Sequence, residues 1–434
     1  MKKAVRLIAI IMSLALVFCL CSCGDVSEST EQVTEKVETA DVDYSNVKIG
    51  FIFLHDPSAS TYDNNFYQAA LQAKEALGLT DEQVMFKWNI PEGNECYETA
   101  LEFVDEGCNI IFADSFGHES YMLQAAEECP EVQFCHATGT HAVVSDLPNY
   151  HNAFASIYNG RYLAGIAAGM KLNEMIEEGK ITAEQAKIGY VGAWPYAEVK
   201  SGYTSFFLGA RSVCESATME VTFTNSWFDI ALEKEGAEKL INDGCVLISQ
   251  HAASEGAPKA CEQAGVPNVA YNVSTIDLGP TTAIISSKIN WQPYFELIIK
   301  AIANNTEIPD DYCGDLSTGS VELTTLNLTA AAEGTQEAID EAMAKIAAGE
   351  LHVYDVNNFT VTRFDETYNQ YKKDSVVTDE EGHLTSYLAD VLDEGDYVGE
   401  TEVVADGYFH ESDVAAGFRS APYFDLDIDG ITIL

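Results

Sequence analysis

The chain has 434 residues, of which 47% are hydrophobic, and a formal charge of −46 at pH 7. This apolar content is enough for two ordinary domains with buried cores. The charge argues against nucleic-acid binding, because contacts to phosphates need clustered Lys and Arg, and it is consistent with solubility outside the cell.

The first residues have the pattern of a secretory signal. Three basic residues precede an apolar run at 7–20, which is too short to span a membrane comfortably and ends in small residues. The segment Leu-Cys-Ser-Cys-Gly at 20–24 resembles a bacterial lipobox, and that resemblance implies a signal peptide at 1–22 and a lipid on Cys23. An uncleaved anchor, or ordinary cleavage near Gly24, is the alternative.

The segment that follows the signal, residues 23–46, is expected to be a flexible tether. It consists mostly of Ser, Thr, Glu, Val and Asp and has no apolar period, so it cannot bury a core. A lipid at one end and a tether behind it predict a folded part held at the extracellular face of the bacterial cytoplasmic membrane.

From residue 47 onward the chain is predicted to alternate strands and helices. The first half is expected to contain strands at 47–54, 84–88, 108–113 and 132–137 and helices at 66–77, 96–106 and 119–128. An apolar helix at 158–172 precedes a second half with strands at 187–193, 221–224, 245–250 and 268–272 and helices at 203–213, 232–241 and 254–264. The strands are largely apolar, as in parallel sheets that are buried on both faces.

Two stretches of the chain repeat one pattern. Residues 99–111 and 236–248 each carry a helix, a Gly and an apolar strand, and the two matching strands upstream begin at Lys48 and Lys187. The repeat unit is βαβ, so the fold class is expected to be α/β with two related, Rossmann-like lobes. Because open α/β sheets bind ligands at the carboxyl ends of their strands, two facing lobes would share one cleft.

Both expected lobes are discontinuous in sequence. The assignment is lobe 1 at 47–145 with a return segment at about 276–330, lobe 2 at 146–275 with a helix at about 330–348, and a C-terminal extension at 349–434. The chain is expected to cross between the lobes at 136–149 and 273–285, where Gly139 and Gly279 can absorb backbone rotation.

Cysteine usage and the acidic C-terminus predict neither disulfides nor a metal site. Eight cysteines lie beyond the signal, but Cys108, Cys135 and Cys245 fall in apolar strand patterns, where a free thiol behaves as a small hydrophobe. We expect mostly free thiols and no metal or cofactor, because no Cys/His cluster has ligand spacing. The acidic segment 425–430 imitates the start of an EF-hand loop, but a hairpin turn at Asp429 and Gly430 explains it better.

Loops that follow the predicted strands bring together side chains suited to a flat heterocycle. These residues are His55, Asp56, Phe66, Ser115, Phe116, Gly117, Trp227, Phe228, His251 and Asn272. Aromatic faces can stack on such a ring, while Asp, Ser and Asn side chains can hydrogen-bond to its edge. Packing in the core is the alternative for Phe66, and a plug at the strand end is the alternative for Trp227.

Four segments together are similar to the basic membrane protein (BMP) family. They are residues 111–117, 160–169, 225–229 and 289–294, and the resemblance extends over about 47–354. Members are solute-binding lipoproteins of ABC importers with a type I periplasmic-binding-protein fold, and characterised members bind purine nucleosides or nucleobases. The resemblance therefore implies a purine ligand, an ABC permease and a separate ATPase as partners, and a protein that is not an enzyme. We expect it to act as a monomer.

The resemblance also implies roles for individual residues. The family's carboxylate after the first strand matches Asp56, its stacking Phe matches Phe66, and its second aromatic residue, from the other lobe, matches Trp227. Its ribose-binding acid falls on Asn272, and a ligand-binding lysine falls approximately on Lys288, for which a surface position is the alternative. An amide lacks the charge-assisted contact that a carboxylate makes with a sugar hydroxyl, so a free base such as adenine and a nucleoside both stay open.

Two other classes of function stay open from the sequence. A sensor of the same fold would pass its closed state to a signalling partner instead of an importer. A nucleoside-processing enzyme would need an Asp cluster around a cation, or a zinc-bound water beside a Glu, and neither spacing occurs in the cleft loops. The expected mechanism is capture, in which one lobe holds the ligand and the other closes over it.

Overall fold

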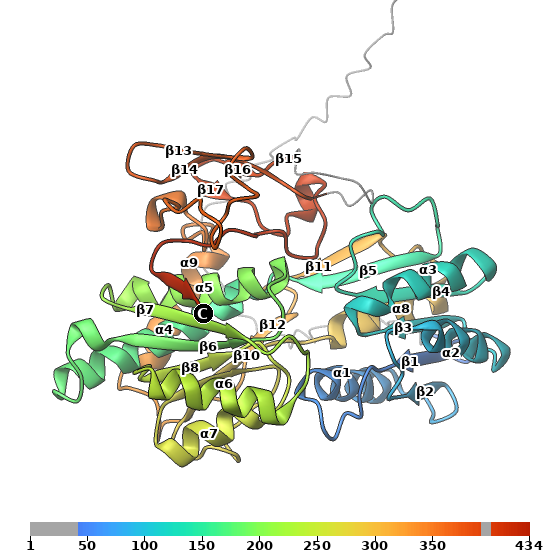
Figure 1. The fold of residues 1–434 in the computed structure, drawn as a ribbon. Coiled ribbons are helices and arrows are strands. Elements are labelled where there is room, and N and C mark those ends of the chain that lie inside the picture. The colour runs from blue at the N-terminus through green and yellow to red at the C-terminus, as the bar shows by residue number, and fades with distance from the viewer. Residues whose placement is uncertain (1–41, 392–400) are drawn as a thin grey trace, which may run out of the picture. The chain divides into compact units, whose positions relative to one another are not determined.

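Two sheets of mainly parallel strands form the framework of the protein (Figure 1). The structure is a computed structural model that describes residues 42–391 and 401–434. The predicted signal peptide at 1–22, the predicted lipidation site at Cys23 and the expected tether up to residue 41 lie outside the described residues.

The first sheet belongs to lobe 1, and all its neighbouring strands are parallel. The strand order is β11-β5-β4-β3-β1-β2. The strands are β1 (Ile49–Ile52), β2 (Val84–Lys87), β3 (Ile110–Ala113), β4 (Gln133–Ala137), β5 (Tyr150–Ala155) and β11 (Asp311–Gly314). The helices are α1 (Thr61–Leu77), α2 (Asn94–Asp105), α3 (Glu119–Glu128) and α8 (Gln292–Asn304). Helices α1 and α8 cover one face of the sheet, and α2 and α3 cover the other.

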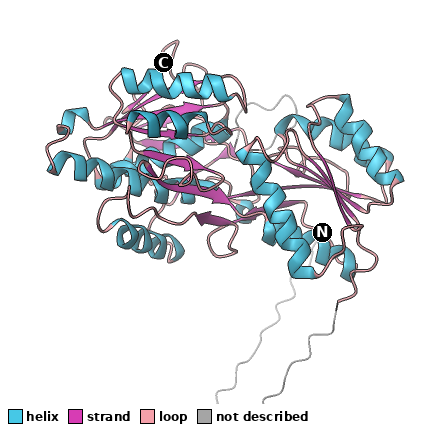
Figure 2. Ribbon diagram, turned by 90° about the horizontal axis from the view of Figure 1, so that it is seen from below, coloured by secondary structure: helices cyan, strands magenta, loops and turns pink. Residues whose placement is uncertain are grey.

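The second sheet belongs to lobe 2 and has the order β12-β10-β9-β8-β6-β7-β18. The strands are β6 (Lys187–Gly192), β7 (Thr218–Phe223), β8 (Leu247–Gln250), β9 (Asn268–Tyr271), β10 (Ala283–Ile289), β12 (Val321–Leu323) and β18 (Ile431–Ile433). The helices are α4 (Ile157–Glu177), α5 (Ala197–Val213), α6 (Ile230–Asn242), α7 (Gly256–Ala264) and α9 (Thr335–Ala347). Helices α4 and α5 pack on one face and α6 and α7 on the other, and Figure 2 shows helices flanking both sheets.

The expected α/β fold with two Rossmann-like lobes is therefore confirmed. The two repeated stretches form corresponding pairs of elements, α2 with β3 and α6 with β8. Strands β1, β3, β8 and β9 are buried along their whole length, which explains why β1 and β3 are apolar without alternation. The eight cysteines beyond the signal are free thiols, and Cys108, Cys135 and Cys245 are buried.

The chain crosses between the lobes at places that differ from the expected ones. Strand β5 pairs with β4 in the first sheet, whereas the sequence analysis assigns residues from 146 onward to lobe 2. Strand β10 pairs with β9 in the second sheet, whereas the sequence analysis assigns 276–330 to lobe 1. A strand belongs to the sheet with which it shares backbone hydrogen bonds. The crossings thus lie after β5, after β10 and between β11 and β12.

The C-terminal extension packs mainly on lobe 2. Strand β14 (Leu384–Ala389) lies between β13 (Val376–Thr378) and β15 (Thr401–Glu402) in a small antiparallel sheet, and β16 (Val404–Ala405) pairs with β17 (Tyr408–Phe409). Buried apolar side chains of the extension join the core around α4 and α5. Its last strand, β18, extends the second sheet beside β7.

The acidic residues near the C-terminus bind lysines and hydroxyl groups. Asp427 accepts hydrogen bonds from Lys200 and from the hydroxyl of Tyr203, and Asp425 forms ion pairs with Lys200 and Lys372. The chain turns before β18, but β18 pairs with β7 in parallel. The predicted hairpin at 429–430 is therefore wrong, because the partner strand comes from lobe 2 and not from the neighbouring sequence.

Helices α4 and α5 approach each other unusually closely through glycines. A Cβ atom on Gly165 would lie 2.0 Å from the carbonyl oxygen of Phe206, and one on Gly209 would lie 2.0 Å from the carbonyl oxygen of Tyr162. Only hydrogen in place of a side chain permits this backbone contact. The contact matters for the site, because α4 and α5 both begin beside the cavity described below.

Gly209→Ala is expected to lower the free energy of unfolding by about 3 kcal/mol, because the added methyl would push α5 away from α4. Urea unfolding followed by circular dichroism measures the change. Gly236→Ala in α6 is the matched control, since its methyl would meet only side-chain atoms at 3.4 Å or more, and helix propensity favours Ala by about 1 kcal/mol. Wild-type stability in Gly209→Ala would contradict the close approach.

Candidate functional site

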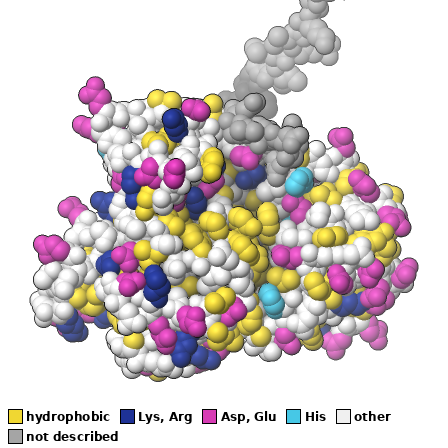
Figure 3. All heavy atoms as spheres, in the orientation of Figure 1, with side chains coloured by type: hydrophobic (Ala, Val, Ile, Leu, Met, Phe, Trp, Pro, Cys, Tyr) yellow, Lys and Arg dark blue, Asp and Glu magenta, His cyan; other side chains and the backbone are white. Residues whose placement is uncertain are grey.

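A cavity lies where the two lobes meet, at the carboxyl ends of strands from both sheets. Its lining consists of Leu54, His55, Ser60, Tyr62, Asp63, Ser115, Phe116 and Thr138 from lobe 1 and Glu198, Trp227, His251, Ala253 and Tyr271 from lobe 2. The volume of the cavity is about 450 Å³ when the part open to solvent is included. The part in which the centre of a water molecule fits is only about 30 Å³, so the cavity is narrow. In Figure 3, hydrophobic side chains gather on the face where the lobes and the extension meet.

The lobe 1 wall is organised around the start of α1. Ser60 caps this helix, since its hydroxyl accepts the backbone N–H of Asp63. The Asp63 carboxylate in turn accepts the backbone N–H of His55 at 2.7 Å, which ties the loop after β1 to the helix. Tyr62 donates its hydroxyl to the carbonyl of Asp114, so its ring is held at the cavity.

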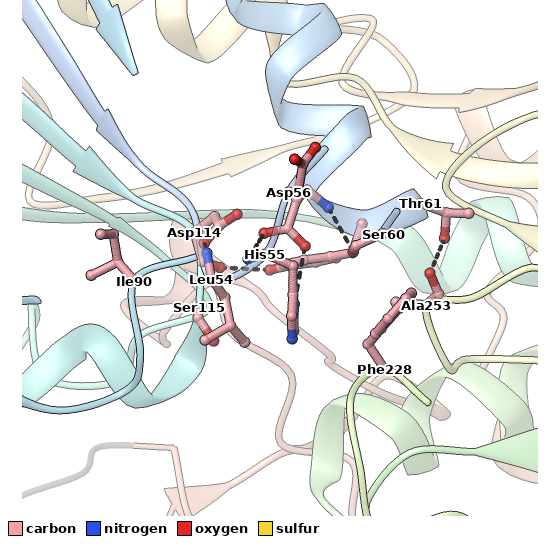
Figure 4. A network of polar contacts seen from close by, with 12 residues as sticks. Leu54, His55, Asp56, Ser60, Thr61, Ile90, Asp114, Ser115, Phe228 and Ala253 are labelled. Carbon is pink, nitrogen blue, oxygen red and sulfur yellow. Dashed lines mark hydrogen bonds and ion pairs between the residues drawn. The ribbon is translucent and has the colours of Figure 1, made fainter. Parts of the chain in front are cut away.

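Two buried carboxyl groups lie side by side below this wall. Asp63 and Asp114 have no exposed surface, and Asp114 accepts the backbone N–H of Leu54 at 3.1 Å (Figure 4). Burial opposes ionisation of both groups, but hydrogen bonds from His55 and Ser60 outweigh it at Asp63 and lower its pKa. Burial and the neighbouring Asp63 charge raise the pKa of Asp114 well above its usual range. The pair is therefore one carboxylate, Asp63, and one neutral acid, Asp114.

Behind the lobe 2 wall lies a buried cation that has no direct carboxylate partner among the described residues. Arg161, at the start of α4, is 1% exposed and stacks on the ring of Tyr271, with 3.4 Å from its guanidinium carbon to the ring centre. It donates to the carbonyl of Gln250 at 3.0 Å and to Nδ1 of His251 at 3.1 Å. Since this nitrogen accepts, His251 donates its other N–H to Glu198, 3.3 Å away. Burial and Arg161 both lower the pKa of His251, which keeps the ring neutral.

Direct contacts join the two lobes around the cavity. The backbone N–H and the Oγ1 hydroxyl of Thr61 both donate to the carbonyl of Ala253, each at 2.9 Å (Figure 4). Beside this contact, the rings of His55 and Phe228 lie 5.2 Å apart. The lobes are therefore in contact across the cleft, and the cavity is largely enclosed.

Five of the predicted site residues line this cavity. They are His55, Ser115, Phe116, Trp227 and His251. Gly117 and Phe228 line an adjoining hollow, which shares Phe116 and Trp227 with the cavity. These seven residues follow the ends of β1, β3, β7 and β8, so their positions agree with the rule that ligands meet the carboxyl ends of parallel strands.

The other four predicted residues lie elsewhere. Asp56 accepts the N–H of Ser58 and so caps its own loop. Phe66 has no exposed surface and stacks on Trp291 at 4.4 Å in the lobe 1 core, because it lies one helical turn beyond Tyr62. Asn272 is buried next to Tyr271 at the end of β9 but is not part of the lining. Lys288 pairs with Glu322 on β12 at 3.0 Å.

The sequence analysis missed four lining residues that shape the site. These are Tyr62, Asp63, Glu198 and Tyr271. Tyr62 and Asp63 open the helix that carries Phe66, so the loop-to-helix boundary after β1 is the signal that could have found them. Tyr271 ends β9 directly before Asn272, whereas Glu198 begins α5 without any distinctive pattern.

Within residues 42–391 and 401–434, no group of three or more His, Cys, Asp and Glu side chains is arranged to hold a metal ion. No helix there is long and apolar enough to cross a bilayer.

Asp114→Asn is expected to gain stability relative to wild type as the pH rises. Because the pKa of Asp114 is raised, the folded protein keeps a proton that the unfolded chain loses above about pH 4. The free energy of unfolding of the wild type therefore falls as the pH rises toward the pKa of Asp114 in the folded protein. An amide carries no such cost and can still accept from Leu54. Urea unfolding between pH 4 and pH 8 measures the difference between variant and wild type.

Asp56→Asn is the control for this pH series. Hydrogen bonds from Ser58 lower the pKa of Asp56, so its replacement should produce no gain in relative stability with rising pH. A difference between Asp114→Asn and wild type that stays constant with pH would show that Asp114 is ionised in the folded protein.

Solved structures of ABC solute-binding proteins share this fold. The crystal structure of an ABC transporter system solute-binding protein from Aeropyrum pernix K1 matches with a TM-score of 0.60 and 16% identity, over 76% of this chain and 97% of that chain. A solute-binding protein from Conexibacter woesei DSM 14684 matches with a TM-score of 0.57 and 19% identity, over 70% and 98% of the two chains. At these identities the likeness shows the fold alone.

Relatives with recorded functions are closer in sequence. A purine-binding protein of Brucella abortus is 29% identical over 308 residues, which cover 71% of this chain and 83% of that protein. A putative ABC transporter glucose-binding protein of Haloferax volcanii is 29% identical over 271 residues, 62% of each chain. The model of the Bmp family, described as ABC transporter substrate-binding protein PnrA-like, matches residues 52–356. This match covers most of the chain and confirms the resemblance, so the protein belongs to the Bmp family of ABC transporter substrate-binding proteins.

Proposed function

We propose that the protein captures a purine base in the cavity between its lobes and delivers it to a membrane permease. As a member of its family, it is an extracytoplasmic solute-binding protein that works with ABC permease components. One observation carries the choice of ligand: aromatic rings from both lobes border one narrow cavity, Tyr62 and Phe116 from lobe 1 and Trp227 and Tyr271 from lobe 2.

A flat heterocycle uses such a lining better than other small solutes do. Aromatic rings prefer offset or edge-to-face contacts, worth about 0.5–1.5 kcal/mol beyond the buried area. Tyr62 is held by the Asp114 carbonyl and Tyr271 by Arg161, so both rings are oriented before the ligand arrives. Rings fixed in advance lose little conformational freedom on binding.

Polar groups at the cavity can form hydrogen bonds with the edge of the base. Asp63 is among the residues that line the cavity, and Nδ1 of His55 lies 3.5 Å from its Oδ2. An ionised carboxylate accepts hydrogen bonds only, so it suits a ring N–H or an exocyclic amine such as that of adenine. Glu198, on the opposite wall, is a second acceptor. A ligand without such donors would leave a buried carboxylate unpaired, which is the basis of discrimination.

The size of the cavity favours a free base over a nucleoside. Only about 30 Å³ of the cavity admits the centres of water molecules, which suits a flat, compact ring system better than a ring that carries a ribose. The residue that matches the family's ribose-binding acid, Asn272, is an amide and stands outside the lining. Both points favour an adenine-like base.

Membrane attachment completes the proposal. The lipobox-like segment before Cys23 and the polar tether behind it support a lipid anchor that keeps the folded lobes close to the permease. A diffusing ligand would then be captured near the machinery that imports it.

Isothermal titration calorimetry of the soluble chain is expected to show binding of adenine, weaker binding of adenosine and no comparable binding of glucose. Trp227→Ala and Tyr62→Ala should each weaken adenine binding about tenfold or more, because each removes one ring from the cavity. Trp88→Ala is the matched control, since Trp88 is 44% exposed and outside the cavity. Wild-type adenine affinity in both cavity variants, or a preference for glucose, would refute the proposal.

Thr61→Val tests closure separately from ligand contact. The variant keeps the shape of the side chain but removes the Oγ1 hydrogen bond to Ala253, which exists only while the lobes touch. We expect adenine affinity to fall about fivefold, corresponding to roughly 1 kcal/mol for one hydrogen bond, and small-angle scattering to report a larger mean radius. Thr80→Val is the control, because Thr80 bonds only to nearby Gln83. Unchanged affinity and radius in Thr61→Val would mean that this contact does not stabilise the closed state.

A further inference from the structure

Two carboxyl side chains line the cavity between the lobes, and that of Glu198 presents far more surface. The Glu198 side chain is 14% exposed, whereas that of Asp63, on the opposite wall, is 1% exposed. Glu198 lies in the first turn of α5, where the free backbone N–H groups favour a negative charge. That charge acts across the cavity, since burial and Glu198 together raise the pKa of Tyr62 well above its usual range. A ligand between the walls can therefore reach the Glu198 carboxylate.

A chain of hydrogen bonds holds one oxygen of this carboxylate. The guanidinium of Arg161 donates to Nδ1 of His251 at 3.1 Å, so the protonated nitrogen of the neutral ring, Nε2, faces Oε1 of Glu198 at 3.3 Å. A guanidinium can only donate, which fixes the direction of the chain. No other donor within residues 42–391 and 401–434 is hydrogen-bonded to the Glu198 side chain. Its second oxygen, Oε2, is therefore left for a ligand.

The helix that carries Glu198 also makes room for this chain. Gly202 lies one turn after Glu198 on α5, and a Cβ atom on Gly202 would lie only 2.9 Å from Nδ1 of His251. On its other side, the ring of His251 lies 5.1 Å from the ring of Tyr271, on which Arg161 stacks. The imidazole is confined between these neighbours, so the carboxylate is oriented before a ligand arrives.

A carboxylate oxygen in this position selects ligands by their donors. It accepts hydrogen bonds and cannot donate one. A 6-aminopurine presents an N–H donor at its exocyclic position, whereas a 6-oxopurine presents an acceptor there. Against Glu198 the oxo group would leave two acceptors facing each other without a proton between them, which costs free energy in a site that excludes water.

We propose that Glu198 accepts a hydrogen bond from the exocyclic amine of a 6-aminopurine and that His251 and Arg161 position it for this contact. The inference rests on the proposed function and names the substituent that the site selects. Glu198 determines specificity because it touches the ligand. His251 and Arg161 act through Glu198 and are positioning residues.

Calorimetry of the soluble chain compares adenine with purine, which carries only hydrogen at C6, and with hypoxanthine, which carries oxygen there. We expect adenine to bind about tenfold more tightly than either, the effect of one hydrogen bond to a charged group. In Glu198→Gln the advantage over hypoxanthine should largely disappear, because the amide can donate to the oxygen. Glu238→Gln is the matched control, since Glu238 pairs with Lys234 on α6 and does not line the cavity.

The role of His251 is tested by the ratio of the adenine and purine affinities. His251→Leu removes the donor to Glu198, and we expect this ratio to fall about threefold. His251→Gln should keep most of it, because an amide can accept from Arg161 and donate to Glu198. A purely structural role would weaken adenine and purine equally, so an unchanged ratio in His251→Leu would contradict the positioning role.

The results distinguish this inference from the proposed function. Equal affinity of the wild type for adenine and purine, or an undiminished advantage over hypoxanthine in Glu198→Gln, would overturn the inference and leave purine capture in place. Absence of adenine binding by the wild type would refute both. The comparison of adenine with purine uses the wild type alone, so it decides the inference even if circular dichroism shows that a variant does not fold.

Discussion

The contact between Thr61 and Ala253 holds the two lobes together, and the enclosed cavity depends on it. The backbone N–H and the Oγ1 hydroxyl of Thr61 both donate to the carbonyl of Ala253. The N–H of Ala253 in turn donates to the carbonyl of Trp227 at 3.0 Å, so the same contact positions a ring of the lobe 2 wall. Neither lobe encloses the cavity by itself, because each supplies only one edge of parallel strand ends. Closure and the formation of the site are therefore one event.

The charges near this cavity differ from those of the chain as a whole. The protein carries a formal charge of −46, yet Arg161 is buried behind Tyr271 with only neutral groups in its hydrogen bonds. On the other side, Asp63 is ionised and Asp114 is neutral. Buried charges are poorly screened by solvent, so their field acts strongly on a bound molecule. Such a field orients a neutral polar ring, whereas Asp63 and Glu198 would repel an anion.

The C-terminal extension adds a third structural part to a two-lobed protein. The hydroxyl of Ser420 donates to Asp311 on β11, in lobe 1, at 2.6 Å. Asp425 and Asp427 bind Lys200 on α5, in lobe 2. A segment bonded to both lobes must break one set of contacts or deform when the lobes separate. The extension is therefore mechanically coupled to closure.

Local sequence patterns predicted the order of the helices and strands, but they did not predict which residue of α1 lies at the cavity. The repeat at 99–111 and 236–248 predicted α2 with β3 and α6 with β8, and the loops after predicted strands led to Ser115, Trp227 and His251. Phe66 on α1 was predicted to lie at the site, but Tyr62, one turn nearer the start of the same helix face, lines the cavity, and Phe66 is buried against Trp291.

By itself, the sequence determined the fold class, the family and the loops that meet at the cleft, because strand and helix periods and motif order are properties of neighbouring residues. Tertiary structure decided three other points: the sheets that β5 and β10 join, the aromatic residue of α1 that lines the cavity, and the pairing of the C-terminal strand with β7. Each of these depends on hydrogen bonds or packing between segments far apart in the chain, and a local pattern carries no information about them.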